Sequence, residues 1–230
     1  VAEGKIKLIT FSPEWPGSVE FIEQCVSHGV KVAIGHTAAN AIQIKAAVAA
    51  GASLSTHLGN GCHHTMHRHD NYIWEQLASE GLWSSIIADG FHLPDSVLKV
   101  FIKVKPQKTI LVSDATSFAG LAPGVYNSHI GGSVELSAEG KLFIRDKPGT
   151  LAGSAQSLLW GVNQLILKNI LPPGDAWNMA SLKPLEYLQE GSGKPFVTGS
   201  AGDYVLFTKG PGGIEIIKSI KSGEIVYSKE

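Results

Sequence analysis

Four short strand candidates each run into a residue that can bind a metal ion or move a proton: His36, His57, His92 and Asp114. Neutral imidazoles are good ligands for zinc and similar divalent ions. A carboxylate close to such an ion can take a proton from water. Two imidazoles and a carboxylate at the ends of strands are therefore what metal-assisted hydrolysis requires.

Taken singly, none of these residues is diagnostic. A histidine at a strand end is more often a hydrogen-bonded structural residue than a metal ligand. Asp114 could simply cap the helix that follows its strand. The spacing alone therefore leaves both a structural role and a hydrolase site open.

The elements that must position these residues follow a βα rhythm from about residue 5 to residue 170. Strands that alternate with helices of this length form right-handed βαβ units and a parallel sheet. In a parallel barrel the carboxyl ends of the strands converge on one face, where barrel enzymes place their chemistry. A doubly wound sheet is less suited to bringing four strand ends to one point. We therefore predict an α/β fold of the TIM-like (β/α)8 barrel type.

This rhythm breaks in the second half of the chain. Alternating residues on either side of a Gly-containing turn predict a β-hairpin insertion near residues 131–145. A last helical segment is expected near Ala176–Gln189, and a β-rich tail with glycine turns follows it. We therefore predict a barrel portion over residues 1–195 and part of a small β domain over residues 196–230.

The composition limits the partners and the compartment. A net charge of −1 gives no reason to expect nucleic acid or an anionic membrane as a partner. No run approaches the roughly 20 apolar residues that span a bilayer. The two cysteines favour a reducing compartment, and we predict a cytoplasmic protein. Four of the tryptophans lie in helical or apolar contexts and are predicted to be core residues: Trp74, Trp83, Trp160 and Trp177.

Five motifs follow one another in order and together resemble one enzyme family. They are Val32-Ala33-Ile34-Gly35-His36-Thr37-Ala38-Ala39, Ser55-Thr56-His57-Leu58-Gly59-Asn60, Ile87-Ala88-Asp89-Gly90-Phe91-His92, Leu111-Val112-Ser113-Asp114-Ala115 and Leu151-Ala152-Gly153-Ser154. Their order and spacing resemble the N-acetylglucosamine-6-phosphate deacetylases of the amidohydrolase superfamily. The resemblance runs from about Leu8 to the tail. It implies an incomplete (β/α)8 barrel with a small β-rich appendage, in which residues 1–195 are the C-terminal part of the barrel.

The resemblance also implies a reaction and a role for individual residues. N-acetylglucosamine 6-phosphate would be hydrolysed to glucosamine 6-phosphate and acetate, with Asp114 first as the base that activates water and then as the acid that protonates the amine. His36 and His57 would bind a divalent metal, with zinc first and iron, cobalt or manganese also compatible. The residues expected to contact the substrate are Asn60, Gly61, Arg68 and His92, and the acyl pocket would be lined by Leu151, Ala152 and Gly153. The small-molecule amino sugar phosphate is the expected partner, and a homodimer is left open.

The sequence departs from the family pattern in two places. The family's remaining metal ligand is a glutamate in a His-Leu-Glu-Gly-Pro type motif on an earlier strand, and that motif is absent here. Because catalytic sites usually supply three protein ligands, the isolated chain is expected to be inactive or weakly active, and the natural protein to be longer. The loop Gly59–Asp70 also lacks the family's Asn-Ala-Met. This leaves room for another N-acyl or cyclic amide substrate, or for a non-catalytic relative that binds a sugar phosphate.

Overall fold

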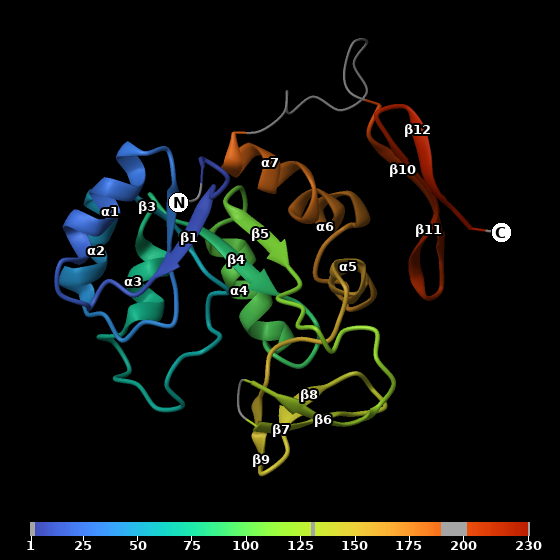
Figure 1. The fold of residues 1–230 in the computed structure, drawn as a ribbon, viewed down its shortest axis with the longest axis horizontal. Helices are drawn as coiled ribbons and strands as arrows, with labels where there is room; N and C mark the ends of the chain where they lie inside the picture. The colour runs from blue at the N-terminus through green and yellow to red at the C-terminus, as the bar shows by residue number, and fades with distance from the viewer. Residues whose placement is uncertain (1–2, 130–131, 190–201, 230) are drawn as a thin grey trace.

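Five parallel strands form the central sheet of the computed structural model, which describes residues 3–129, 132–189 and 202–229 (Figure 1). The strands are β1 (Leu8–Phe11), β2 (Lys31–Ile34), β3 (Ala52–Ser55), β4 (Trp83–Ile87) and β5 (Thr109–Val112). They lie in sequence order, and each strand pairs in parallel with the next. All five carboxyl ends therefore lie along the same edge of the sheet.

One helix follows each of the first four strands and returns the chain to the start of the next. These helices are α1 (Ser18–Ser27), α2 (Ala41–Ala49), α3 (Tyr72–Ala78) and α4 (Asp95–Val104). α2 begins with a capping box in which the Asn40 and Gln43 side chains each accept a hydrogen bond from the other residue's backbone amide. This repeated strand–helix order is the connectivity of a barrel wall.

The core of the protein lies mainly between the sheet and the helices outside it. α1 and α2 bury Ile22, Ile44 and Ala47 against β2, and a second cluster packs Leu98 and Phe101 of α4 against β4 and β5. The same second cluster includes residues of α5 (Leu158–Leu167) and α6 (Pro173–Ala180).

The opposite, inner face of the sheet meets a short helix, α7 (Leu182–Leu188). Tyr187 of this helix packs in a cluster with Ala33, Leu54 and Ile110. Its hydroxyl lies 2.9 Å from Ser53 Oγ, which ties α7 to β3. The helical segment predicted near Ala176–Gln189 is thus two helices, because Ser181 between them has a non-helical backbone conformation.

Two antiparallel sheets lie outside the parallel sheet (Figure 1). The first contains β6 (Gly124–Ser128), β7 (Gly132–Leu136), β8 (Leu142–Ile144) and β9 (Lys147–Leu151). The hairpin predicted near residues 131–145 corresponds to its β7–β8 pair. The second contains β10 (Tyr204–Gly210), β11 (Gly213–Lys221) and β12 (Glu224–Ser228). The predicted domain boundary at residues 195/196 lies outside the described residues.

The α/β class and the incomplete barrel with a β-rich appendage are confirmed by this arrangement. The tryptophan prediction is wrong in two cases, because Trp74 is 50% exposed and Trp160 is 39% exposed. Both indole N–H groups donate to backbone carbonyls, which explains why these rings are held at the surface. Within the described part of the chain, no helix has the length and apolar character needed to cross a membrane.

Candidate active site

His36 and His57 meet at the carboxyl edge of the parallel sheet. His36 follows β2 and His57 follows β3, and their Nε2 atoms lie 2.9 Å apart. The two rings are nearly perpendicular, with centroids 4.6 Å apart. His57 is buried, whereas His36 is exposed. The structure therefore brings together, at one point, the Nε2 atoms of the two histidines predicted as metal ligands.

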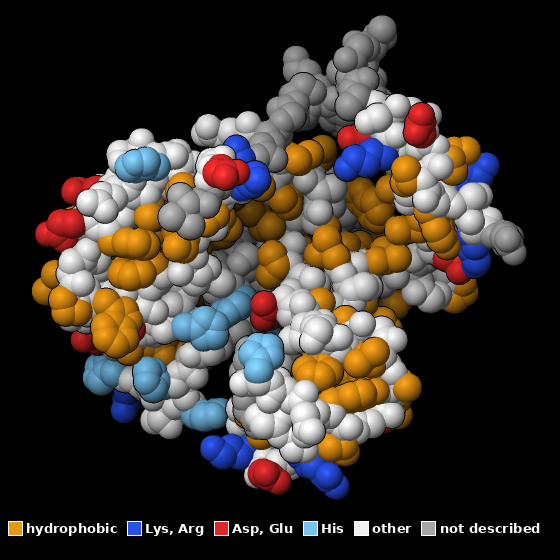
Figure 2. All heavy atoms as spheres, viewed as in Figure 1, with side chains coloured by type: hydrophobic (Ala, Val, Ile, Leu, Met, Phe, Trp, Pro, Cys, Tyr) orange, Lys and Arg blue, Asp and Glu red, His pale blue; other side chains and the backbone are white. Residues whose placement is uncertain are grey.

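Asp114 follows β5 and lines the same open pocket as His57. The pocket has a volume of about 280 Å³ and lies against the inner face of the sheet, where α7 contributes Tyr187 and Leu188. The Asp114 side chain is exposed to this opening. Figure 2 shows histidine side chains gathering beside a hollow in this region of the surface. A carboxylate thus faces the space beside the histidine pair.

His36, His57 and Asp114 share an uncommon backbone conformation. Their φ angles are 50°, 30° and 50°, in the left-handed region that non-glycine residues seldom adopt. Each lies two residues beyond the end of its strand, so the left-handed turn directs the side chain over the edge of the sheet. Such conformations cost about 1–3 kcal/mol each and persist only where the surrounding structure imposes them.

This strain predicts a difference in stability between two substitutions of His36. Both His36→Gly and His36→Ala remove the ring, but only glycine relieves the left-handed strain of about 1–2 kcal/mol. Because glycine also loses about 0.5–1 kcal/mol more backbone entropy on folding, we expect His36→Gly to be the more stable by about 0.5–1 kcal/mol. Urea unfolding of the two variants measures this difference.

A helical position provides the matched control for this comparison. Gln24 is exposed within α1, where glycine should be less stable than alanine by about 1 kcal/mol. The order of the glycine and alanine variants should therefore reverse between positions 36 and 24. An alanine variant at position 36 that is as stable as the glycine variant would show that the backbone there is not strained.

The polypeptide that follows His57 folds back onto both histidines. The Asn60 backbone amide and side-chain amide both donate to the His57 carbonyl, at 2.9 and 3.1 Å. Gly61 has a φ of 65°, and a Cβ built on it would lie 2.7 Å from His36 Nδ1. Only glycine therefore allows this close approach to the ring. Asn60, Gly61 and His36 line a second hollow of about 20 Å³.

The segment that contains Leu151, Ala152 and Gly153 runs beside Asp114. Ala115 and Ser154 form a parallel bridge, and the Thr116 amide donates to the Ser154 carbonyl at 2.8 Å. A Cβ on Gly153 would lie 2.6 Å from Thr116 Cγ2, so a side chain at this position would disrupt the contact. Of the three residues predicted to line an acyl pocket, Gly153 is thus adjacent to Asp114, whereas Leu151 pairs with Phe143 and Ala152 packs against the β6–β9 sheet.

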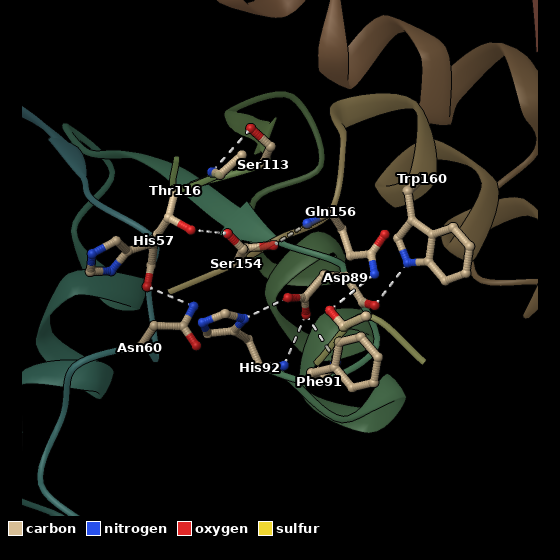
Figure 3. Close-up of polar contacts among 12 residues, drawn as sticks. His57, Asn60, Asp89, Phe91, His92, Ser113, Thr116, Ser154, Gln156 and Trp160 are labelled. Atoms are coloured by element: carbon tan, nitrogen blue, oxygen red, sulfur yellow. Dashed lines mark hydrogen bonds and ion pairs between the residues drawn. The ribbon is translucent and has the colours of Figure 1, made fainter. Parts of the chain in front are cut away.

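His92 lies close to the same group of residues, in the loop that follows β4. Figure 3 shows its ring between Asp89 and Asn60, with His57 nearby. The His92 side chain is only 9% exposed, and its Nδ1 lies 2.7 Å from Asp89 Oδ2. The structure therefore places the predicted substrate residue beside the metal-ligand candidates.

Arg68 is placed differently from the other predicted residues. It is exposed on the loop between β3 and α3, and it lines neither the pocket of His57 and Asp114 nor the hollow beside His36. Its backbone carbonyl accepts a hydrogen bond from Trp74 Nε1. In this conformation its guanidinium is not part of the group formed by the other residues.

The histidine pair fits a divalent metal ion only in part. Two imidazole nitrogens that converge at 2.9 Å are suitable donors for such an ion. Among the described residues, however, no three His, Cys, Asp or Glu side chains form a group that could hold a metal ion. The four histidines of the loop after Gly61, which are His63, His64, His67 and His69, therefore do not form such a group either. His36 and His57 alone would thus offer two ligands, whereas catalytic metal sites usually have three protein ligands.

The environment of His57 favours the neutral imidazole that binds metals. Burial lowers the pKa of His57 and the nearby His36 and His92 act in the same direction, whereas a backbone hydrogen bond and the Asp114 carboxylate oppose the change. The net effect is a pKa below the ordinary value. His57 Nδ1 is buried and has no hydrogen-bond partner within the described residues. Metal-binding histidines usually donate a hydrogen bond from their second nitrogen, and the described residues do not supply an acceptor for it.

Three residues that sequence reasoning did not single out hold this arrangement in place. Glu14 accepts hydrogen bonds from the Thr37 hydroxyl at 2.5 Å and from the Ala38 amide at 2.8 Å, which ties the loop after β1 to the loop of His36. Ser12 Oγ donates to the Gly35 carbonyl at 2.9 Å. Ser85 Oγ accepts from the His57 amide at 2.7 Å. The sequence carried one indication of Ser12 and Glu14, because both residues come just after β1, at the same edge of the sheet as His36.

Comparisons with known proteins extend this description. An N-acetylgalactosamine-6-phosphate deacetylase from Escherichia coli O157:H7 is 29% identical over 188 residues, which are 82% of this chain and 49% of that protein. An N-acetylglucosamine-6-phosphate deacetylase from Bacillus subtilis is 31% identical over the whole chain and 57% of its own length. No protein-family model matches the chain.

A solved structure of similar fold has the same kind of name as these relatives. The N-acetyl-D-glucosamine-6-phosphate deacetylase from Mycobacterium smegmatis superposes with a TM-score of 0.85 at 26% identity, covering 98% of this chain and 59% of that one. The chain spans about half the length of the curated relatives it matches. It is therefore a relative of the N-acetylglucosamine-6-phosphate deacetylase family that corresponds to about half of a family member.

Proposed function

We propose that this chain forms the catalytic portion of a metal-dependent deacetylase that hydrolyses N-acetylglucosamine 6-phosphate to glucosamine 6-phosphate and acetate. The observation that carries the proposal is the meeting of two imidazole Nε2 atoms at 2.9 Å beside a pocket that Asp114 lines. The names of the relatives support the substrate, since they include several N-acetylglucosamine-6-phosphate deacetylases.

The residues of the site divide the work of amide hydrolysis. His36 and His57 would hold a divalent metal ion, which when bound polarises the acyl carbonyl and lowers the pKa of water. Asp114 takes a proton from the attacking water as its oxygen bonds to the acyl carbon. It then gives that proton to the amine nitrogen as the carbon–nitrogen bond breaks and acetate forms. Leu151, Ala152 and Gly153 would enclose the acetyl group.

Zinc is the metal that we propose first, because two imidazoles are ligands that it readily accepts, and iron, cobalt and manganese are also compatible. Asn60, Gly61 and His92 would contact the amino sugar. The third metal ligand would come from residues outside those described. Cytoplasmic location and a homodimer stay predictions.

N-acetylgalactosamine 6-phosphate is the second candidate substrate. Two of the relatives, from Escherichia coli O157:H7 and a Shewanella strain, are N-acetylgalactosamine-6-phosphate deacetylases, at 29% identity each. The two sugars differ only in the orientation of one hydroxyl group. The residues near His92 and Asn60 would therefore have to distinguish the two sugars by a hydrogen bond to that one hydroxyl group.

Acetate release from four substrates tests the proposal: the 6-phosphates of N-acetylglucosamine and N-acetylgalactosamine, and the two unphosphorylated sugars. The assay uses the longest natural form of the protein with added zinc. We expect turnover of the phosphorylated sugars and little of the others.

Arg68→Ala tests whether Arg68 contacts the phosphate of the bound substrate. If it does, KM for the phosphorylated sugar should rise about 10- to 100-fold, which corresponds to the loss of a charge-assisted hydrogen bond.

Arg145 supplies the matched control, since it is an exposed arginine at the turn between β8 and β9. Arg145→Ala should leave KM unchanged. An unchanged KM in Arg68→Ala would place the phosphate contact elsewhere. Failure to release acetate from any amino sugar phosphate, with the metal bound, would show that the proposed function is wrong.

A further inference from the structure

The carboxylate of Asp89 is buried in the loop after β4, and both of its oxygens are occupied. The residue is 5% exposed. Its Oδ1 accepts hydrogen bonds from the backbone amides of Phe91 and His92, at 2.9 and 3.0 Å. Its Oδ2 lies 2.7 Å from His92 Nδ1. Burying a carboxylate is unfavourable unless it is hydrogen-bonded, and both oxygens of Asp89 are.

The direction of the Asp89–His92 hydrogen bond follows from the charge of Asp89. Burial by itself would raise the pKa of Asp89, but the hydrogen bonds from the His92 ring and backbone and from the Phe91 amide outweigh it and lower the pKa below its ordinary value. Near neutral pH the carboxylate is therefore ionised and can only accept. The proton in this hydrogen bond belongs to His92 Nδ1.

The loop of Asp89 is attached to α5, far away in the sequence. Trp160 Nε1 of α5 donates to the Asp89 backbone carbonyl at 3.0 Å. Gly90 has a φ of 88°, and a Cβ on it would contact the Gln164 side chain of the same helix at 3.4 Å. Figure 3 shows Asp89 between the Trp160 indole and the His92 ring. Asp89 is thus fixed from both sides.

We propose that Asp89 is a positioning residue, held by Trp160, that fixes the ring orientation and the Nδ1–H tautomer of His92 so that Nε2 alone meets the substrate. Figure 3 shows the second ring nitrogen on the side of the ring that faces Asn60, away from Asp89. A neutral His92 then offers a lone pair to a hydroxyl or N–H group of an amino sugar. Only the statement that His92 contacts the substrate rests on the proposed function.

Asp89→Asn is the sharpest variant, because it keeps the shape and changes the hydrogen-bond directions. The two backbone amides continue to require an acceptor at the position of Oδ1, so the asparagine oxygen should stay there. Its NH₂ group then faces His92 Nδ1 and donates to it. The ring proton must move to Nε2, as in the wrong-tautomer variants of other histidine–aspartate pairs.

Nitrogen-15 NMR of the histidine rings in the full chain reads this tautomer directly, at a pH at which the rings are neutral. The His92 signals are assigned by their loss in His92→Gln. We expect protonated Nδ1 and unprotonated Nε2 in the wild type, and the reverse in Asp89→Asn. Asp95→Asn is the matched control, since that carboxylate pairs with Lys168 and not with His92; it should leave the His92 tautomer unchanged.

Two results would overturn the assignment: a wild-type His92 protonated at Nε2, or an Asp89→Asn protein that folds and keeps the Nδ1–H tautomer. The wild-type measurement decides even if Asp89→Asn does not fold. In the active protein, Asp89→Asn should lower kcat/KM about 10- to 100-fold, as loss of a histidine's orienting partner does in metal sites. If no sugar phosphate is hydrolysed, the proposed function is at fault, and the tautomer result still decides the role of Asp89.

Discussion

Asp114→Asn is expected to leave the fold intact and to lower the rate of N-acetyl hydrolysis about 10²- to 10⁴-fold, the usual contribution of a positioned acid–base residue. Asparagine has the size of aspartate and is among the residues that tolerate the left-handed region, where Asp114 has a φ of 50°. It cannot take a proton from water or return one to the departing amine. Steady-state kinetics of acetate release measure the loss, and circular dichroism checks the fold.

The control for this prediction is Asp146→Asn, at an exposed position in the turn between β8 and β9. Its kcat should match that of the wild type. Bound metal should stay the same in Asp114→Asn, because His36 and His57 are the proposed ligands in this chain. A turnover number within a few-fold of the wild type would remove Asp114 from the mechanism.

His57→Ala is expected to weaken metal binding about 100-fold or more and to abolish hydrolysis. Losing even an outer partner of a metal-binding histidine costs about 10- to 100-fold, and losing one of the ligands should cost at least as much. His57 is also the buried member of the pair, so no solvent-exposed side chain can easily take its place. Equilibrium dialysis with zinc measures the affinity, and the assay of acetate release measures the activity.

His64→Ala tests whether this loss is specific to His57. His64 is exposed on the loop after Gly61, which is rich in histidine but does not form a metal-binding group within the described residues. Zinc affinity at the catalytic site and activity should be unchanged in this variant. If His64→Ala weakened zinc binding as much as His57→Ala, the loop histidines would have to be counted as ligands.

The extent to which sequence alone predicted the site is clearest at the strand ends. His36, His57 and Asp114 were singled out because each follows a short strand, and consecutive parallel strands align their carboxyl ends. That reasoning uses only local patterns and one topological rule. It could not show that the Nε2 atoms of His36 and His57 meet, since this depends on their left-handed backbone conformations.

Contacts between distant segments were beyond the reach of sequence patterns. The Trp160–Asp89 hydrogen bond joins residues 71 positions apart, and the bridge between Ala115 and Ser154 joins residues from separate elements. No periodicity specifies such pairs, because they depend on how helices and loops pack after the strands have formed. Trp160 was accordingly predicted to lie in the core, whereas it lies at the surface beside the site.

The sequence by itself thus determined the α/β class, the order of strands and helices, and the residue types at each carboxyl end. These properties follow from alternation of apolar segments with turns, which short-range physics controls. Only the tertiary structure decided which of those residues lie close together. It placed His92 beside Asp89 and left Arg68 on an exposed loop, because hydrogen bonds and packing between distant segments, and not spacing along the chain, determine where each side chain lies.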